Sequence, residues 1–314
     1  MTETVFTETA FTEIAAGLQF PEGPVAMPDG SVVVVEVLGE RLTRVYPDGS
    51  TELICEAKGG PNGLAVGPDG AFYLCNNGGC FTPRELGTLL VPGPFDLDRY
   101  TGGLIQRIDH DGKLTNLYTN CGGRPLRAPN DLVMDGHGGF YFTDFGIQDV
   151  GARTADLGAV YYARCDGSEI HEVAYPVYSP NGIGVSPDGA TLYWTETYTG
   201  RLFRRHIAEP GVLEPPSSKY DPAALLCGLP GLQLLDSLAV DADGWVAVGT
   251  LIAGAVTSIA PDGSAVAQAA TGDPYTTNLC FGGPDMRTAF VTLSGTGRLV
   301  SMEWPRRGLR LAHQ

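Results

Sequence analysis

Six polar residues recur at one place in a repeated pattern, and their types are suited to binding an ion or a substrate. Each is followed by a short apolar run, then by a turn residue seven positions later, and then by a second apolar run. The six residues are Glu22, Asn62, Asn130, Asn181, Asp236 and Asn278. Since each occupies the same place in its repeat, a closed ring of repeats would gather all six side chains around one axis.

The repeats have the content of strand–turn–strand units, as Val32–Val35 and Phe140–Phe142 illustrate. Repeats of roughly fifty residues with several short strands are typical of propeller blades. The sequence therefore predicts an all-β fold, a six-bladed β-propeller with four antiparallel strands per blade, in a single domain over residues 1–314. The last repeat lacks a clear fourth strand, and the strand-like segment Val5–Ile14 is predicted to supply it and close the ring.

A long segment rich in Gly, Pro and Phe, Asn76–Thr101, interrupts the second repeat. Long segments inside compact repeats are often lids or binding loops, although a tolerated surface insertion is the alternative. We expect its central part, from Asn77 to Tyr100, to close over a substrate.

A second set of polar residues lies fourteen positions after the first, where the chain has crossed the turn and returned to the same end. Its members are Glu36, Asn76, Asp144, Thr195, Thr250 and Thr292. Two polar sets at the same end predict one polar face at a channel mouth. Of the second set, we predict that Asn76 and Asp144 contact substrate.

The first set offers oxygen ligands without His or Cys. Glu22 and Asp236, beside Asn130 and Asn181, suit a hard divalent cation whose charge offsets both carboxylates. Calcium is the first choice, with manganese, magnesium, zinc or iron(II) as alternatives, although zinc usually recruits His or Cys. No histidine falls at a ring position, so a Ser-His-Asp mechanism is poorly supported. Asn62 and Asn278 are interpreted as residues that hold turns.

Composition and charge exclude several classes of function. The formal net charge of -16 argues against binding nucleic acid. No apolar run approaches a membrane span, and the polar N-terminal residues lack the features of a signal peptide. The seven cysteines form no CxxC pair and are expected to be free thiols of a cytoplasmic protein. The oligomeric state is left open between monomer and dimer.

Five segments resemble the family of senescence marker protein, gluconolactonase and luciferin-regenerating enzyme. They are Phe20–Pro24, Ala128–Leu132, Ser179–Gly182, Leu235–Asp241 and Thr277–Asp285. The resemblance implies a six-bladed propeller with one divalent metal, held by Glu22, Asn181 and Asp236. It further implies that Asn130 is a fourth ligand or touches metal-bound water and substrate.

The resemblance also implies hydrolysis of a sugar lactone, while a related branch, that of diisopropyl-fluorophosphatase, hydrolyses organophosphorus fluoridates. Sugar-lactonase members of the senescence-marker type carry an Arg where this chain has Ala128, and Arg127 beside it is predicted to contact substrate. The partner is thus expected to be a small lactone.

Our hypothesis is metal-assisted opening of the lactone, with Asp236 as the catalytic residue. Asp236 would take a proton from the attacking water, or would itself attack as a nucleophile. Asp131 and Asp144 are candidates for a supporting base. A fluorophosphatase-like hydrolase at the same metal site, and a non-enzymatic binding platform with a structural ion, are the alternatives.

Overall fold

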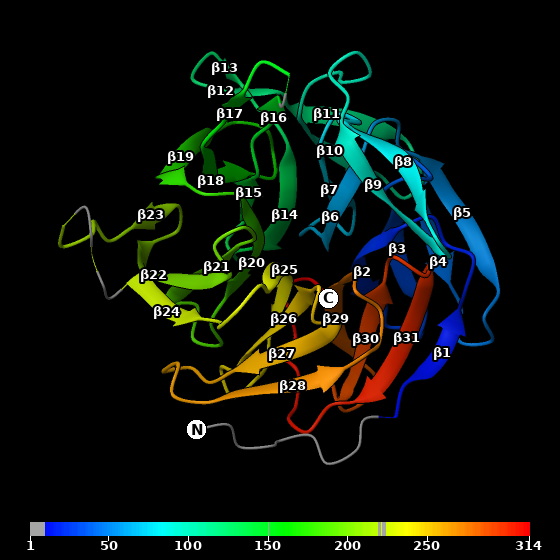
Figure 1. Cartoon of the computed structure of the whole chain (residues 1–314). Helices are drawn as coiled ribbons and strands as arrows, with labels where there is room; N and C mark the ends of the chain where they lie inside the picture. Colours follow the sequence, from blue (N-terminus) through cyan, green and yellow to red (C-terminus); the bar gives the residue numbers. More distant parts are fainter. Residues whose placement is uncertain (1–9, 150, 219–220, 222–223) are drawn as a thin grey trace.

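Six blades of antiparallel strands surround a central axis (Figure 1). This computed structural model describes residues 10–149, 151–218, 221 and 224–314. The predicted all-β, six-bladed propeller is confirmed, and the described residues contain no α-helix. Accordingly, nothing in this part of the chain forms a helix of the length and apolar character that crossing a membrane requires.

The first three blades contain four strands each, numbered outward from the axis. Blade one is β2 (Pro21–Ala26), β3 (Val32–Glu36), β4 (Arg41–Val45) and β5 (Thr51–Glu56). Blade two is β6 (Pro61–Val66), β7 (Phe72–Asn76), β10 (Leu104–Ile108) and β11 (Leu114–Tyr118). Blade three is β14 (Pro129–Met134), β15 (Gly139–Asp144), β18 (Gly158–Arg164) and β19 (Ile170–Val177).

The other three blades repeat this order with one addition. Blade four is β20 (Pro180–Val185), β21 (Thr191–Glu196), β22 (Arg201–Glu209) and β24 (Leu225–Gly228), with β23 (Val212–Leu213) also on β22. Blade five is β25 (Leu234–Val240), β26 (Val246–Leu251), β27 (Ala255–Ile259) and β28 (Val266–Ala270). Blade six is β29 (Thr276–Gly282), β30 (Thr288–Leu293), β31 (Arg298–Glu303) and β1 (Thr12–Ala15).

The ring is closed by an N-terminal strand, as the sequence predicts. β1 pairs antiparallel with β31, with Thr12 opposite Ser301, and so supplies the outermost strand of the last blade. Of the segment predicted to do this, Val5–Thr9 lies outside the described residues. The six innermost strands contact one another in order around the axis. A circular arrangement removes the free sheet edges that would otherwise invite further pairing.

The core lies between neighbouring blades. All of β3 is buried, because the faces of blade one pack on the blades at both sides. Val33 and Val35, for example, pack in one cluster with Leu64 and Leu74 of blade two. Each such side chain contributes about 1.5–3 kcal/mol when buried, so packing between blades fixes the position of each innermost strand.

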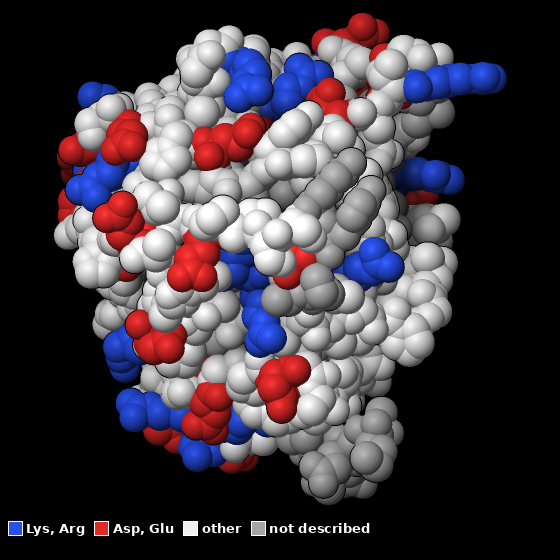
Figure 2. Space-filling model, turned by 90° about the vertical axis from the view of Figure 1, so that its left-hand side faces the viewer, with Lys and Arg blue, Asp and Glu red and all other residues white. Residues whose placement is uncertain are grey.

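Three two-stranded hairpins extend from the blades. They are β8 (Phe81–Leu86) with β9 (Leu89–Phe95), β12 (Asn120–Cys121) with β13 (Arg124–Pro125), and β16 (Gln148–Asp149) with β17 (Thr154–Ala155). The long segment in the second repeat is therefore an ordered hairpin, β8–β9. On the side of the ring shown in Figure 2, acidic and basic side chains are interspersed.

Candidate active site

The first polar residue of each repeat lies at the start of an innermost strand, beside a break in the strand register. In blade three, for example, Pro129 pairs with Asp144 and the register then shifts before Leu132, so Asn130 falls within the irregularity. The same shift follows Pro180 in blade four and Leu235 in blade five. Bulges of this kind re-aim side chains near active sites. Here they place Asn130, Asn181 and Asp236 at one end of the channel.

Glycines after three of these residues let adjacent innermost strands approach closely. A Cβ atom on Gly182 would lie 2.6 Å from the Leu238 nitrogen and 2.7 Å from the Ser237 Cα. A Cβ atom on Gly63 would lie 2.5 Å from the Asp131 Cα. Only a residue without a Cβ fits at such distances. The Asn181–Gly182 step therefore sets the spacing between blades four and five at the site.

Seven polar residues from several blades line one cavity of about 210 Å³ at this mouth. They are Glu22, Asn62, Asn77, Asn130, Asn181, Thr197 and Asp236. All four predicted metal ligands are therefore brought together, and Asn62, interpreted from the sequence as a turn residue, joins them. Asn278 does not line this cavity; its Nδ2 donates to Glu22 Oε2 at 2.9 Å from the neighbouring blade.

Glu22 and Asp236 are both buried. Burial raises the pKa of Glu22, against the lowering effect of hydrogen bonds from Asn278, Thr277 and Gly23. Burial, followed by repulsion from Glu22, raises the pKa of Asp236 well above its usual range. The same two causes raise the pKa of Asp131 to about 7. Among the described residues that line the cavity, none is Lys, Arg or His.

One amide oxygen in the cavity has an unmet hydrogen-bonding capacity. Asn130 Oδ1 is buried and has no hydrogen-bond partner. A buried acceptor without a partner is costly unless a ligand satisfies it. Within the described residues, no group of three or more His, Cys, Asp or Glu side chains could hold a metal ion. Two carboxylates with two amides are a different, all-oxygen donor set, and that set fits a hard divalent cation.

Hydrogen bonds connect the predicted ligands to their surroundings. The Asn181 amide hydrogen-bonds the Asp236 carboxylate, and this contact acts to lower its pKa. Ser237 Oγ donates to Asn181 Oδ1 over a long 3.4 Å and also hydrogen-bonds Asp131. Asp131 itself faces a separate cavity of about 60 Å³ on the axis behind the ring of ligands. That second cavity is also lined by Leu311 and Gln314 near the C-terminus, which lies at the centre of the ring (Figure 1).

Two threonines on the second strands of their blades, Thr143 of β15 and Thr195 of β21, hydrogen-bond the backbones of two predicted ligands. Thr143 Oγ1 donates to the Asn181 carbonyl at 2.5 Å, and Thr195 Oγ1 donates to the Asp236 carbonyl at 2.7 Å. Thr195 Oγ1 also accepts from the Gly182 N–H at 2.8 Å. Each hydroxyl thus links its own blade to a ligand residue in the next blade.

Asn76 and Asp144, predicted to contact substrate, do not line the cavity. Asp144 accepts from the Arg127 and Ala128 N–H groups, both at 2.7 Å, and from that of Gly146. Asn76 accepts from the Gly60 and Gly78 N–H groups. Their oxygens hold the loops that lead into the innermost strands, because the second strand lacks the bulge that turns the first-set side chains toward the axis.

Arg127 also does not line the cavity. Its Nε lies 2.7 Å from Asp156 Oδ2, its guanidinium lies over the Tyr100 ring, and its side chain is 45% exposed. Arg127 is thus held by Asp156 and Tyr100 and is not among the residues that line the cavity.

Several residues of the cavity lining are not singled out by the repeat, although Asn77, Phe81 and Phe95 lie in the segment expected to close over a substrate. Asn77 follows Asn76 directly, and the Asn-Asn-Gly-Gly run was a signal for a tight turn at the mouth. Thr197 Oγ1 is buried without a hydrogen-bond partner, as Asn130 Oδ1 is. The aromatic lining residues Phe81, Phe95, Phe145, Tyr198 and Tyr275 come from loops and the β8–β9 hairpin, where no repeat period marks them.

Comparison with known proteins assigns the family. Residues 20–295 match the family described as SMP-30/Gluconolactonase/LRE-like region, and the chain belongs to it. Lactonase drp35 of Staphylococcus saprophyticus is 31% identical over 230 residues, which cover 72% of this chain and 62% of that protein. The aligned part of the chain thus spans less than two thirds of that relative's length.

Solved structures of low identity share the fold. A gluconolactonase from Xanthomonas campestris superposes with a TM-score of 0.73 at 22% identity, covering 94% of this chain and 89% of that one. A calcium-binding protein, regucalcin, from Agrobacterium tumefaciens superposes with a TM-score of 0.72 at 19% identity, covering 96% and 95%. At these identities the likeness supports the propeller fold and no more.

Proposed function

We propose that the protein is a divalent-metal-dependent hydrolase that opens a lactone, a cyclic carboxylic ester. The observation that carries this is the cavity floor: two buried carboxylates, Glu22 and Asp236, lie beside the unpartnered amide oxygen of Asn130. Membership of a family that includes gluconolactonases, and similarity to a lactonase, support the same reaction.

Glu22, Asn130, Asn181 and Asp236 would hold the cation, with calcium preferred for an all-oxygen site. When bound, the cation supplies a Lewis acid that polarises the ester carbonyl. The donor set leaves Asn62, Asn77 and Thr197 on the cavity lining for contacts with substrate. For the substrate itself, the resemblance predicts a sugar lactone. Its hydroxyl groups would then form hydrogen bonds with Asn62, Asn77 and Thr197.

Asp236 is assigned the proton transfer. Its carboxylate would accept a proton from the attacking water, whose oxygen bonds to the carbonyl carbon. The ring C–O bond then breaks, and the same proton passes to the departing oxygen, giving one hydroxy acid from one lactone and one water. The hydrogen bond from Asn181 orients this carboxylate. Asp144 is unsuited to assist, because its oxygens accept backbone N–H groups outside the cavity.

A pH-indicator assay on the stripped protein, with and without added calcium, manganese or magnesium, tests the proposal. Lactone opening releases acid, which should require a metal and should fall by at least about a thousandfold in Asp236→Ala. Full turnover in Asp236→Ala, with the same metal content, would refute the assignment. Hydrolysis of a fluorophosphate in preference to every lactone would favour the phosphotriesterase alternative.

A further inference from the structure

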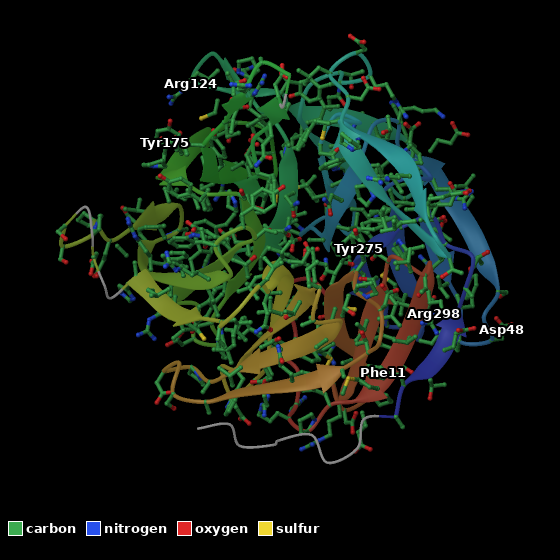
Figure 3. All side chains as sticks on the ribbon, in the orientation of Figure 1. Phe11, Asp48, Arg124, Tyr175, Tyr275 and Arg298 are labelled. Carbon is green, nitrogen blue, oxygen red and sulfur yellow. The ribbon has the colours of Figure 1, made fainter. Side chains whose placement is uncertain are left out.

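The wall of the active-site cavity has a different chemistry from its floor. Eleven of the eighteen lining residues are apolar or aromatic, and the other seven include the predicted metal ligands. Six are aromatic: Phe20, Phe81, Phe95, Phe145, Tyr198 and Tyr275. Figure 3 shows Tyr275 near the centre of the ring, while the other labelled residues lie toward its circumference.

One side of this wall is the β8–β9 hairpin, which emerges from blade two. Phe81 and Phe95 face each other across the hairpin, with ring centroids 4.6 Å apart, and Pro92 lines the cavity beside them. The hairpin also reaches blade six, where the Leu90 N–H donates to the Gly295 carbonyl at 3.0 Å. Because it is bonded at both ends of its span, the hairpin presents a fixed apolar surface to the cavity.

The opposite side comes from the loops of blades three to five. Phe145 and Tyr198 pack edge to face with centroids 5.6 Å apart, and Leu234 and Leu251 continue the lining. Tyr198 is 52% exposed at the rim. Two aromatic groups thus face the cavity from different blades. Aromatic side chains bind flat or apolar ligand surfaces well and satisfy few hydroxyl groups.

Polar capacity on the wall is small. Besides the four predicted ligands, the side chains of Asn62, Asn77 and Thr197 and the phenol hydroxyls of Tyr198 and Tyr275 are the polar groups of the lining residues, and Thr197 Oγ1 has no hydrogen-bond partner in the structure. A ring hydroxyl placed against the aromatic wall would lose its water without gaining a partner, which is unfavourable. One or two polar substrate atoms near the floor match this distribution better than a ring carrying hydroxyls on every carbon.

The geometry points to a lactone that carries an apolar ring or alkyl chain, with the carbonyl at the polar floor and the apolar body against Phe81, Phe95, Phe145 and Tyr198. This inference rests on the proposed lactone hydrolysis and names its substrate class. The β8–β9 hairpin is then the element that determines which substrates fit.

A matched pair of substrates tests the inference. δ-Valerolactone and δ-decalactone share one ring and differ by a pentyl chain, and glucono-δ-lactone supplies the hydroxylated comparison. With calcium present, kcat/KM should be at least about tenfold higher for δ-decalactone than for δ-valerolactone, because added methylene groups gain apolar contact. A higher kcat/KM for glucono-δ-lactone than for δ-decalactone would overturn the inference and leave lactone hydrolysis intact.

Variants locate the effect on the hairpin. Phe95→Ala should lower kcat/KM for δ-decalactone about tenfold and change the value for δ-valerolactone less than about threefold, whereas Phe95→Leu should retain most of the preference. Leu86→Ala, on the same hairpin but outside the cavity lining and 50% exposed, is the control and should change neither value. Phe145→Ala repeats the test from blade three if Phe95→Ala folds poorly. A preference that survives both alanine substitutions would refute the assigned wall.

Lactams separate binding from hydrolysis. Calorimetric titration with δ-valerolactam and its pentyl-substituted homologue, which resist hydrolysis, reports the apolar preference without turnover. Tighter binding of the pentyl compound by at least about tenfold, without hydrolysis of any lactone, would uphold the apolar cavity and reject the proposed reaction. Equal binding of the two lactams would reject the apolar substrate class.

Discussion

Replacing Gly182 by Ala should disturb the site through the contact between two blades. A Cβ atom there would lie 2.6 Å from the Leu238 backbone nitrogen, 2.7 Å from the Ser237 Cα and 2.8 Å from the Asp236 backbone carbonyl oxygen. All three are backbone atoms, so no flexible side chain can move aside. The strands β20 and β25 must separate by about 0.8 Å before the shortest approach reaches an ordinary contact of 3.4 Å.

Two consequences follow from that separation. Overpacking of this kind should lower the free energy of unfolding by about 1–3 kcal/mol. Asn181 precedes the substituted glycine and Asp236 lies on the strand that is pushed away, so their oxygens should no longer fit one cation. We expect calcium affinity to fall by about 10–100-fold, the range found when groups that orient metal ligands are removed.

Calcium titration by calorimetry and urea unfolding at fixed calcium measure the two effects. Gly228→Ala is the matched control, because its Cβ would lie 3.7 Å from Arg201 Cγ, at an ordinary contact distance in the same blade. It should keep wild-type affinity and stability or gain slightly in stability. Wild-type calcium affinity in Gly182→Ala would refute the claim that blade spacing sets the ligand geometry.

Three further variants probe groups around the site. Thr195→Val removes the hydroxyl that spans two blades and should weaken calcium binding by about tenfold in calorimetry, whereas Thr195→Ser should restore it; equal affinity for Val and wild type would contradict this role. Arg127→Ala should change kcat/KM less than about threefold, since the side chain pairs with Asp156 outside the cavity; a loss above about thirtyfold would restore the predicted substrate contact. Burial acts to raise the pKa of Glu36, but hydrogen bonds, led by that from Arg41, lower it below its usual 4.5 overall. The stability that this shift supplies is present above pH 4.5 and is lost as pH falls through the lowered pKa. Glu36→Gln should therefore weaken the fall in the free energy of unfolding, measured with urea, as the pH is lowered below 4.5. An unchanged dependence on pH in this range would contradict the shift.

Most of the fold could be predicted from the sequence because the same pattern recurs in every blade. Apolar runs around Asp-Gly turns at a regular distance are local signals, and each became a pair of strands next to the axis. The outer strand of blade four, Leu225–Gly228, pairs with β22 across a long connection, so no local turn marks its position in the sequence. The predicted long segment, Asn76–Thr101, proved to contain a hairpin, which long-range contacts with blade six hold in place.

The directions of the side chains at the site were harder to predict from the sequence than the positions of the strands. The four predicted metal ligands do converge, since residues at one place in a repeat share one position around the axis. Asn76 and Asp144 share the same end of the strand yet bond backbone, because the bulge that reorients the first set is a property of strand pairing. The aromatic wall is assembled from loops of different length and could not be read from a repeat period.

The most direct test of the site is calorimetric titration of calcium into metal-stripped protein, paired with the Asn130→Ala variant. We expect one calcium per chain in the wild type and at least about tenfold weaker binding in Asn130→Ala, because the unpartnered Oδ1 of Asn130 would be a ligand. No saturable binding of calcium, manganese or magnesium by the folded wild-type protein, or equal affinity in Asn130→Ala, would contradict the metal site on which the proposed function depends.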